Sequence, residues 1–211
     1  MLLKRMASHG TLPEDLTGFV LAGGVSRRMG RDKAQIPWRG GTLLTHAIEQ
    51  VEGVAPKVFV VGSLGANKLP VPVLADNLSG VGPLAGIQTA LSNSSTDWNL
   101  VIAVDLPLVM AEVLNWIAGF RTRATQVAIA PRVNSRLQPL CAVYHRGLLP
   151  EIDEALARQQ SSIHRLLERL STRIIEEDEL IANGFAPETF LNVNTPEDLE
   201  CARAIAKTMY G

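Results

Sequence analysis

Short apolar runs alternate along the first half of the chain with segments in which apolar residues recur at helical spacing. The runs typical of buried strands cover residues 19–22, 58–61, 71–75 and 100–104. Helical spacing extends from Thr42 to Gly53, and again after the Gly82-Pro83 pair. Strands that alternate with helices predict an α/β fold whose open, mostly parallel sheet is doubly wound, with helices on both faces.

The second half of the chain is less regular. Strands are expected at residues 127–131 and 137–144, around a turn at Asn134-Ser135, and a late strand is expected at Ile174-Ile175. Apolar spacing predicts short amphipathic helices at residues 149–156 and 163–170. Thr195 and Pro196 are suited to begin a C-terminal helix, with Asp198 close to its positive end.

Length and composition indicate one globular domain. The chain has 211 residues, of which 46% are hydrophobic, and no linker or repeat interrupts it. Residues 1–17 lack periodicity, so we expect a mobile leader there and the domain over residues 18–211. The net charge of −1 argues against general attraction to nucleic acid or to a membrane. Cys141 and Cys201 are far apart in the sequence and the histidines are scattered, so a zinc site is not expected. We expect the two thiols to stay reduced in the cytoplasm.

The loop after the first strand combines glycines with cations. Leu21 and Ala22 end the apolar run, and Gly23 and Gly24 follow it. Cations follow within the next ten residues, at Arg27, Arg28, Arg31 and Lys33. Glycine lets backbone N–H groups approach a polyphosphate, and clustered cations favour an anion between them. The spacing of Gly23, Gly24 and Gly30 fits neither the G-x-G-x-x-G motif of dinucleotide-binding folds nor the P-loop motif. A solvated turn with surface arginines is the alternative interpretation.

Two aspartates follow expected strands directly, at the sheet edge where open α/β sheets bind ligands. Asp105 follows the most hydrophobic run, where a divalent cation would compensate its poorly solvated charge. Its alternative role is the N-cap of a helix from about Met110. The Asp76 carboxylate could accept two adjacent N–H donors of a ligand together. An ordinary turn aspartate is the alternative for Asp76.

Several segments, taken in order, resemble the molybdenum cofactor guanylyltransferases, a family of nucleotidyltransferases. They are L-A-G-G-V-S-R-R-M-G-R-D-K at 21–33, G-P-L-A-G-I at 82–87, D-L-P at 105–107, Q-P-L at 138–140 and N-V-N-T-P-E-D-L at 192–199. The resemblance implies a Rossmann-like nucleotidyltransferase fold. It implies transfer of GMP from GTP to the terminal phosphate of molybdopterin, with Mg²⁺ bound and pyrophosphate released. The leader is the main departure from the family pattern.

The resemblance also implies roles for individual residues. Catalysis would involve Arg28, Lys33 and Asp105, with Asp105 as the Mg²⁺ ligand. The nucleotide would be bound by Leu21, Ala22, Gly23, Gly24, Lys33, Asp76 and Asp105. Asp76 would contact guanine, whose two adjacent N–H donors one carboxylate can accept together, whereas cytosine offers only its exocyclic amine. Gln138, Asn192 and Asn194 would bind the acceptor, although a plain strand and turn or capping roles remain alternatives for them.

Other functions and partners remain open from the sequence. The nearest alternative is a relative that uses CTP or a sugar phosphate. A catalytically silent nucleotide-binding regulator is the alternative from another class. Other cofactor-biosynthesis proteins and the molybdoenzymes that accept the product are the possible protein partners.

Overall fold

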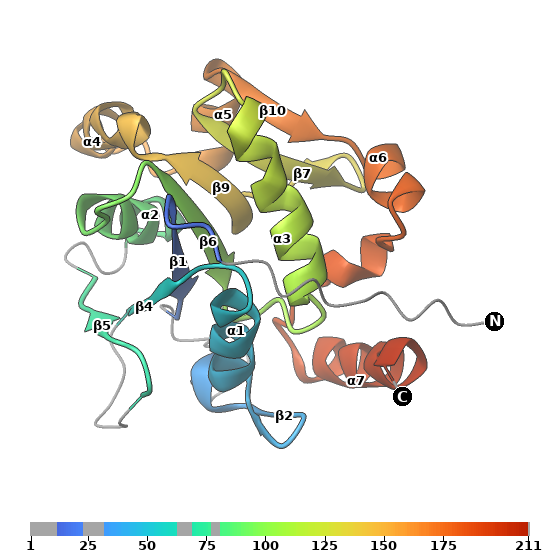
Figure 1. Cartoon of the computed structure of the whole chain (residues 1–211). Helices are drawn as coiled ribbons and strands as arrows, with labels where there is room; N and C mark the ends of the chain where they lie inside the picture. The colour runs from blue at the N-terminus through green and yellow to red at the C-terminus, as the bar shows by residue number, and fades with distance from the viewer. Residues whose placement is uncertain (1–11, 23–31, 63–68, 77–80, 211) are drawn as a thin grey trace.

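The main sheet has its strands in the order β10-β7-β9-β6-β1-β4-β5, with β8 paired to β7 (Figure 1). The computed structural model describes residues 12–22, 32–62, 69–76 and 81–210. The strands are β1 (Leu16–Leu21), β4 (Lys57–Val61), β5 (Val73–Leu74), β6 (Trp98–Ala103), β7 (Ala128–Val133), β8 (Arg136–Leu137), β9 (Cys141–His145) and β10 (Thr172–Ile175). Among these strands β9 is antiparallel to its neighbours β6 and β7, and β8 is antiparallel to β7, while the other pairs are parallel, so the predicted mostly parallel sheet is confirmed.

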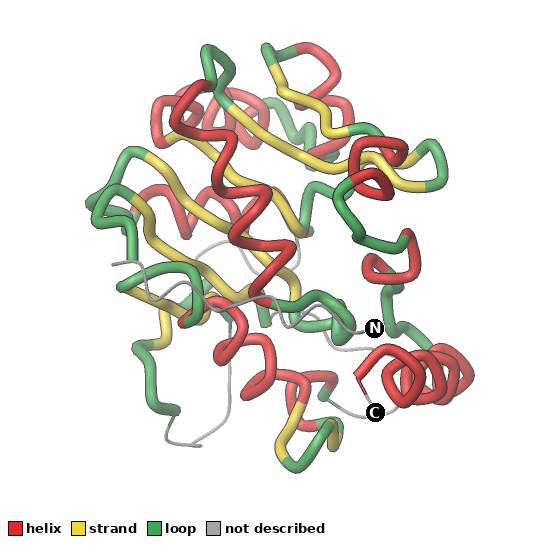
Figure 2. The backbone as a smooth tube through the Cα atoms, turned by 45° about the vertical axis from the view of Figure 1, so that its right-hand side comes forward, coloured by secondary structure: helices red, strands yellow, loops and turns green. Residues whose placement is uncertain are grey.

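Helices cover both faces of the sheet, as predicted, and Figure 2 shows them on either side of the strands. One face carries α1 (Leu43–Glu52), α3 (Ala111–Gly119), α6 (Glu177–Ala182) and α7 (Pro196–Tyr210). The other face carries α2 (Pro83–Ser92), α4 (Leu149–Ala157) and α5 (Ile163–Arg169). No helix in the described ranges is long and apolar enough to cross a membrane.

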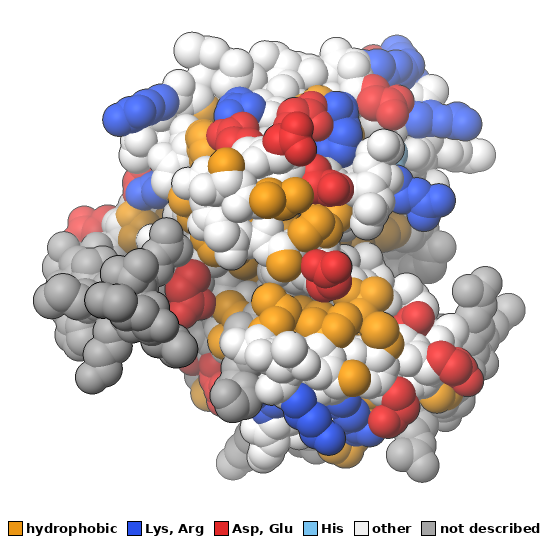
Figure 3. Space-filling model, turned by 90° about the vertical axis from the view of Figure 1, so that its right-hand side faces the viewer, with side chains coloured by type: hydrophobic (Ala, Val, Ile, Leu, Met, Phe, Trp, Pro, Cys, Tyr) orange, Lys and Arg blue, Asp and Glu red, His pale blue; other side chains and the backbone are white. Residues whose placement is uncertain are grey.

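Short elements complete the described chain. They are the 3-10 helices η1 (Lys33–Gln35), η2 (Phe120–Arg123), η3 (Arg146–Leu148) and η4 (Pro187–Phe190), and the small hairpin of β2 (Pro37–Trp38) and β3 (Gly41–Thr42). Partly buried Trp116 of α3 packs against the core together with Phe120 and Phe185, and its ring contacts both of theirs. Figure 3 shows hydrophobic side chains reaching the surface on the face that carries α6 and α7.

The central strand β1 begins earlier than the apolar run alone indicated. Leu16 is fully buried and is the first residue of β1, whereas the leader was expected to extend to residue 17. Asp15, just before the strand, forms an ion pair with Arg121 in which the nitrogen and oxygen are 2.8 Å apart. The leader boundary was therefore placed too late, because Thr17 and Gly18 interrupt the apolar pattern although backbone pairing continues through them.

Local sequence signals set the helix starts. Thr42 caps α1 by accepting a hydrogen bond from the Thr45 N–H, and the Thr45 hydroxyl accepts one from the Thr42 N–H, which is a capping box. Helix α2 begins at Pro83, where a missing N–H costs nothing. Both starts agree with the predictions.

The hairpin after β7 is confirmed, and its second strand is shorter than predicted. Asn134 and Ser135 have φ angles of +49° and +61°, which is the geometry of a two-residue type I′ turn. After Leu137 the chain turns again, because the Cys141 N–H donates to the Gln138 carbonyl. The strand expected over residues 137–144 is thus divided into β8 and β9. Strand β9 then enters between β6 and β7.

Candidate functional site

The carboxyl ends of β1 and β6 meet at one edge of the sheet. Leu21 of β1 lies opposite Ala103 of β6, and the pairing continues because the Val104 N–H donates to the Leu21 carbonyl. Asp105 is the next residue. Leu21 and Ala22 are buried beside this edge, with exposed fractions of 9% and 8%. The strand ends therefore place Asp105 where a ligand-binding edge was predicted.

Lys33 contacts residues from two distant parts of the chain. Its ammonium group Nζ lies 2.9 Å from Asp105 Oδ2 and donates to Asn194 Oδ1 at 2.8 Å. The side chains of Lys33 and Asp105 are only 14% and 19% exposed. A cation, a carboxylate and an amide oxygen thus converge at the sheet edge, as predicted for Lys33, Asp105 and Asn194.

The short helix η1 fixes the position of Lys33. Asp32 caps this helix by accepting a hydrogen bond from the Ala34 N–H at 3.0 Å. Ala34 is buried, and the Leu43 N–H at the start of α1 donates to the Ile36 carbonyl just after η1. Because both ends of this segment are anchored, the Lys33 side chain is directed at Asp105.

The segment before α7 fixes the position of Asn194. The Val193 N–H donates to the Asp105 carbonyl at 2.8 Å, and Val193 is fully buried. The Asp198 carboxylate accepts hydrogen bonds from the N–H groups of Asn194 and Thr195, both at 2.9 Å, and the Thr195 hydroxyl caps the Asp198 N–H. The bond from the Asn194 N–H is the main reason that the pKa of Asp198 lies below its usual value, and the charge of Lys33 lowers it further. Asn194 is therefore attached both to β6 and to the first turn of α7.

The second oxygen of Asp105 has properties that suit a cation. Oδ1 is buried, and no hydrogen-bond donor for it lies among the described residues. A buried acceptor without a donor is costly, and a divalent ion would satisfy it. No group of three or more His, Cys, Asp or Glu side chains that could hold a metal ion occurs in the described ranges. An Mg²⁺ ion held by one carboxylate and by substrate phosphates fits this donor set.

The alternative roles can be compared with the observed helix starts. Helix α3 begins at Ala111 with Met110 at its cap position, so Asp105 is not its N-cap. Asn192 donates from its side chain to the Phe190 carbonyl at 3.4 Å, which is a local turn contact. Gln138 donates from its side chain to the Arg136 carbonyl at 3.3 Å. Among the described residues the Asn194 side chain is hydrogen-bonded to Lys33, whereas those of Gln138 and Asn192 are not.

The remaining predicted nucleotide contacts lie elsewhere along the edge or outside the described residues. Asp76 follows β5 and is half-buried at the carboxyl end of that edge strand. The strand expected over residues 71–75 is shorter than predicted and covers Val73 and Leu74. Gly23, Gly24 and Arg28 lie outside the described residues.

Sequence reasoning missed His46, which supports the segment after Asp105. His46 lies on α1 with an exposed fraction of 7%, and its Nε2 is 3.1 Å from the Pro107 carbonyl oxygen. Because a carbonyl only accepts, Nε2 carries the proton. Burial lowers the pKa of His46. A single histidine on an otherwise apolar helix face gives no sequence signal for this contact.

Comparisons with known proteins agree with this geometry. The family model described as a MobA-like NTP transferase domain matches residues 18–174. A probable molybdenum cofactor guanylyltransferase of Pelotomaculum thermopropionicum is 33% identical over 193 residues, which cover 90% of this chain and 93% of the relative. A protein of the same description from Bacillus thuringiensis is 32% identical over 188 residues, covering 86% of this chain and 92% of the relative.

A solved structure extends the similarity to three dimensions. The crystal structure of molybdopterin-guanine dinucleotide biosynthesis protein A from Archaeoglobus fulgidus aligns with a TM-score of 0.80 and 28% identity. The alignment covers 92% of this chain and 100% of that one. The similarity in three dimensions therefore extends over most of the chain.

Proposed function

The chain belongs to the family of MobA-like NTP transferases and is a nucleotidyltransferase, and from this we propose that it transfers GMP from GTP to the terminal phosphate of molybdopterin. The products are the guanine dinucleotide form of the cofactor and pyrophosphate. The observation that carries the proposal is the position of Lys33 Nζ between Asp105 Oδ2 and Asn194 Oδ1. Such a group of polar atoms, at the carboxyl ends of β1 and β6, suits a polyphosphate and its cation.

The proposed reaction is a direct displacement. A phosphate oxygen of molybdopterin attacks the α-phosphorus of GTP, a new P–O bond forms, and the bond to the bridging oxygen of the β-phosphate breaks. Pyrophosphate leaves with the electron pair. Since the acceptor phosphate is itself the nucleophile, no covalent intermediate with the protein is required.

Lys33 would hold the reacting phosphates. An ammonium group has three N–H donors, and Asp105 and Asn194 use two of them. The third has no acceptor among the described residues and could bind a phosphate oxygen, where the positive charge would stabilise charge that develops in the transition state. Arg28 is proposed to act in the same way on the leaving pyrophosphate.

Asp105 would hold Mg²⁺ through Oδ1, the oxygen that has no donor among the described residues, while Oδ2 holds Lys33. When bound, the ion supplies charge neutralisation at the phosphate oxygens. Asp105 therefore positions two cations, the metal and the Lys33 ammonium, on the same phosphate chain.

The base of GTP is assigned to the opposite side of β1 from Asp105. Asp76 follows β5, and β4 lies between β5 and β1. Two strand spacings of about 5 Å each therefore separate β5 from β1. We assign the guanine edge to Asp76 and the phosphates to Gly23, Gly24 and the backbone around Leu21 and Ala22.

The acceptor side is assigned to the strands beyond β6. Gln138, Asn192 and Asn194 are proposed to contact molybdopterin. The thiols of Cys141 and Cys201 are both free, which fits a reaction in the reducing cytoplasm. Other cofactor-biosynthesis proteins and the recipient molybdoenzymes are the proposed protein partners.

The function is tested with the purified chain, Mg²⁺, molybdopterin and either GTP or CTP. We expect pyrophosphate release and the dinucleotide product with GTP, and loss of both in Asp105→Ala and Lys33→Met. The matched control is Lys57→Met, because Lys57 is exposed at the amino end of β4, away from the site. Absence of product from the wild-type chain with GTP, or equal turnover with CTP, would refute the proposal.

A further inference from the structure

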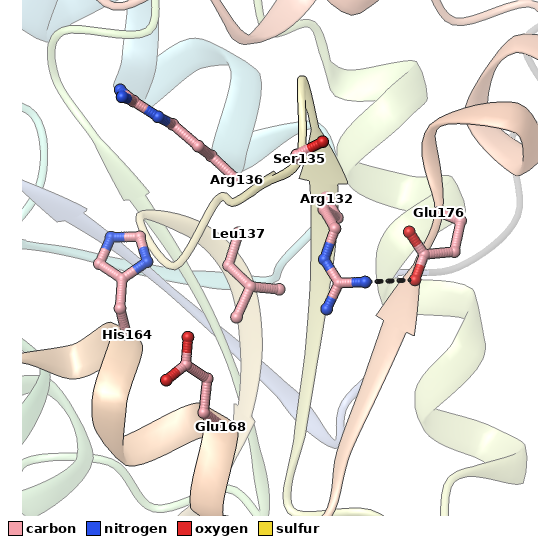
Figure 4. Close-up of a pocket in the computed structure, with 7 residues that line it drawn as sticks. All are labelled: Arg132, Ser135, Arg136, Leu137, His164, Glu168 and Glu176. Carbon is pink, nitrogen blue, oxygen red and sulfur yellow. Dashed lines mark hydrogen bonds and ion pairs between the residues drawn. The ribbon is translucent and has the colours of Figure 1, made fainter.

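A pocket of about 570 Å³ lies beside the β7–β8 hairpin, and neither the family comparison nor the motifs assign it. Figure 4 shows Leu137 of the hairpin at its centre, between Arg132 of β7 and the side chains of His164 and Glu168 on α5. Since His164 and Glu168 are four residues apart on a helix, they share one face, and that face is turned to the pocket.

The charged groups of the pocket balance one another. Arg132 Nη1 and Glu176 Oε1 are 2.7 Å apart, so this cation already has its anion. The side chains of Arg136, His164 and Glu168 form no hydrogen bond or ion pair with the described part of the chain. One unpaired guanidinium and one unpaired carboxylate therefore remain for a ligand. A simple anion is disfavoured, because it would meet the carboxylates of Glu168 and Glu176.

The pocket lies at the same edge of the sheet as Asp105. Ile129 of β7 pairs with Val143 of β9, and Val143 pairs with Leu100 of β6. Arg132 lies three residues after Ile129 along β7, and Asp105 lies five residues after Leu100 along β6. Because β7 and β6 run in the same direction, both residues lie towards the same edge of the sheet. Two strand spacings, about 10 Å, separate β7 from β6.

Residues 138–140 connect the pocket to the site. At one end the Gln138 N–H donates to the Pro131 carbonyl, next to Arg132, at 2.8 Å. At the other end the Leu140 carbonyl accepts from the Ala103 N–H, two residues before Asp105, at 2.8 Å. A ligand that extends along this segment would reach from the pocket to Asp105.

We propose that this pocket binds the pterin ring system of the acceptor, the 2-amino-4-oxopyrimidine half in particular. The proposal rests on the proposed function for the identity of the acceptor. This ring presents two adjacent N–H donors, which the Glu168 carboxylate can accept together, and a carbonyl oxygen, to which Arg136 can donate. Leu137, with an exposed fraction of 7%, is the apolar side chain that lines the pocket beside the ring. The phosphate arm then points along residues 138–140 towards Lys33.

The test measures binding of pterin alone to the full chain. Binding is monitored through the intrinsic fluorescence of pterin. Glu168→Gln should weaken pterin binding about ten-fold, since one hydrogen bond to a charged acceptor is replaced by a repulsive amide donor. Glu52→Gln is the matched control, because Glu52 is an exposed glutamate at the end of α1. It should bind pterin as tightly as the wild type does.

Lumazine, which carries an oxygen in place of the 2-amino group, sharpens the assignment. The wild type should prefer pterin over lumazine about ten-fold, and Glu168→Gln should lose that preference. Equal pterin binding by Glu168→Gln and Glu52→Gln, absence of saturable binding, or displacement of pterin by inorganic phosphate would each overturn the proposal.

Steady-state kinetics separate this proposal from the proposed function. Glu168→Gln should raise the KM for molybdopterin about ten-fold and leave the KM for GTP unchanged. If the wild type transfers GMP and both KM values are unchanged in Glu168→Gln, the pocket assignment is wrong and the function stands. If pterin binds through Glu168 but no GMP is transferred, the pocket assignment stands and the function is wrong.

Discussion

Replacing Lys33 with methionine tests whether Lys33 and Asp105 act as one unit. The substitution keeps the apolar stem of the side chain and removes the ammonium group. Asp105 Oδ2 and Asn194 Oδ1 then both lose their donor, while Oδ1 of Asp105 already has none among the described residues. The result is a mostly buried carboxylate with no counter-charge paired to it among the described residues.

The expected cost follows from that burial. Removing one partner of a fully buried ion pair costs about 3–5 kcal/mol. The Lys33 and Asp105 side chains are 14% and 19% exposed, so solvent screening reduces the expected cost to about 2 kcal/mol. For a chain of this length that corresponds to a Tm lower by roughly 4–8 °C.

A divalent cation should reverse the effect. Without Lys33 the Asp105 carboxylate is available to Mg²⁺ or Mn²⁺ without competition from an ammonium group. A ligand at about 100 times its Kd adds about 2.7 kcal/mol to the stability of the folded state. We therefore expect either ion, without nucleotide, to raise the Tm of Lys33→Met more than that of the wild type, as measured by thermal unfolding followed by circular dichroism.

The double variant completes the experiment. Lys33→Met with Asp105→Asn removes both charges, so it should regain part of the lost stability and lose the response to the metal ion. Lys57→Met, on the exposed start of β4, should behave like the wild type throughout. If Lys33→Met keeps the wild-type Tm and the wild-type response to Mg²⁺, the two side chains do not form the unit described here.

The remaining predictions concern Asp198, Asp76 and His46. Asp198→Asn should destabilise the chain by about 1 kcal/mol at pH 7, because the Asn194 and Thr195 N–H groups lose their charged acceptor at the positive end of α7. Since the pKa of Asp198 is lowered from 3.8, this contribution is present above pH 3.8, and urea titrations should show it disappear as the pH falls below that value. Asp76→Ala should lose the preference for GTP over CTP in competition kinetics, and an unchanged preference would exclude Asp76 as the guanine contact. The pKa of His46 is lowered from 6.5 by burial, so protonation favours the unfolded chain and the wild type should lose stability as the pH falls below 6.5. His46→Gln should lack that part of the loss, and an identical pH profile would contradict the assignment.

The sequence determined the elements whose signals are local. The apolar runs predicted β1, β4 and β6, and the capping residue Thr42 and the Gly82-Pro83 pair predicted the starts of α1 and α2. The type I′ turn at residues 134–135 was marked by its polar residues. Such signals depend on backbone preference and on burial of a continuous apolar run, and both are properties of neighbouring residues.

The sequence also indicated that Lys33, Asp105 and Asn194 belong together, but only through strand-end placement and a family resemblance. Their contacts depend on segments that are 72 and 161 residues apart in the chain. Distances such as 2.9 Å between Lys33 Nζ and Asp105 Oδ2 follow from how η1 is anchored to the start of α1 and how the segment before α7 is anchored to Asp105.

Only the tertiary structure decided the place of β9, the contact between His46 and Pro107, and the pocket beside Leu137. An apolar strand has the same pattern whether it runs parallel or antiparallel to its neighbours, so nothing local directs β9 between β6 and β7. A buried histidine or an unpaired glutamate likewise acquires its role from whatever the fold brings against it. Preferences for a local backbone conformation depend on adjacent residues, whereas the neighbours of a side chain across the sheet depend on the packing of the whole domain.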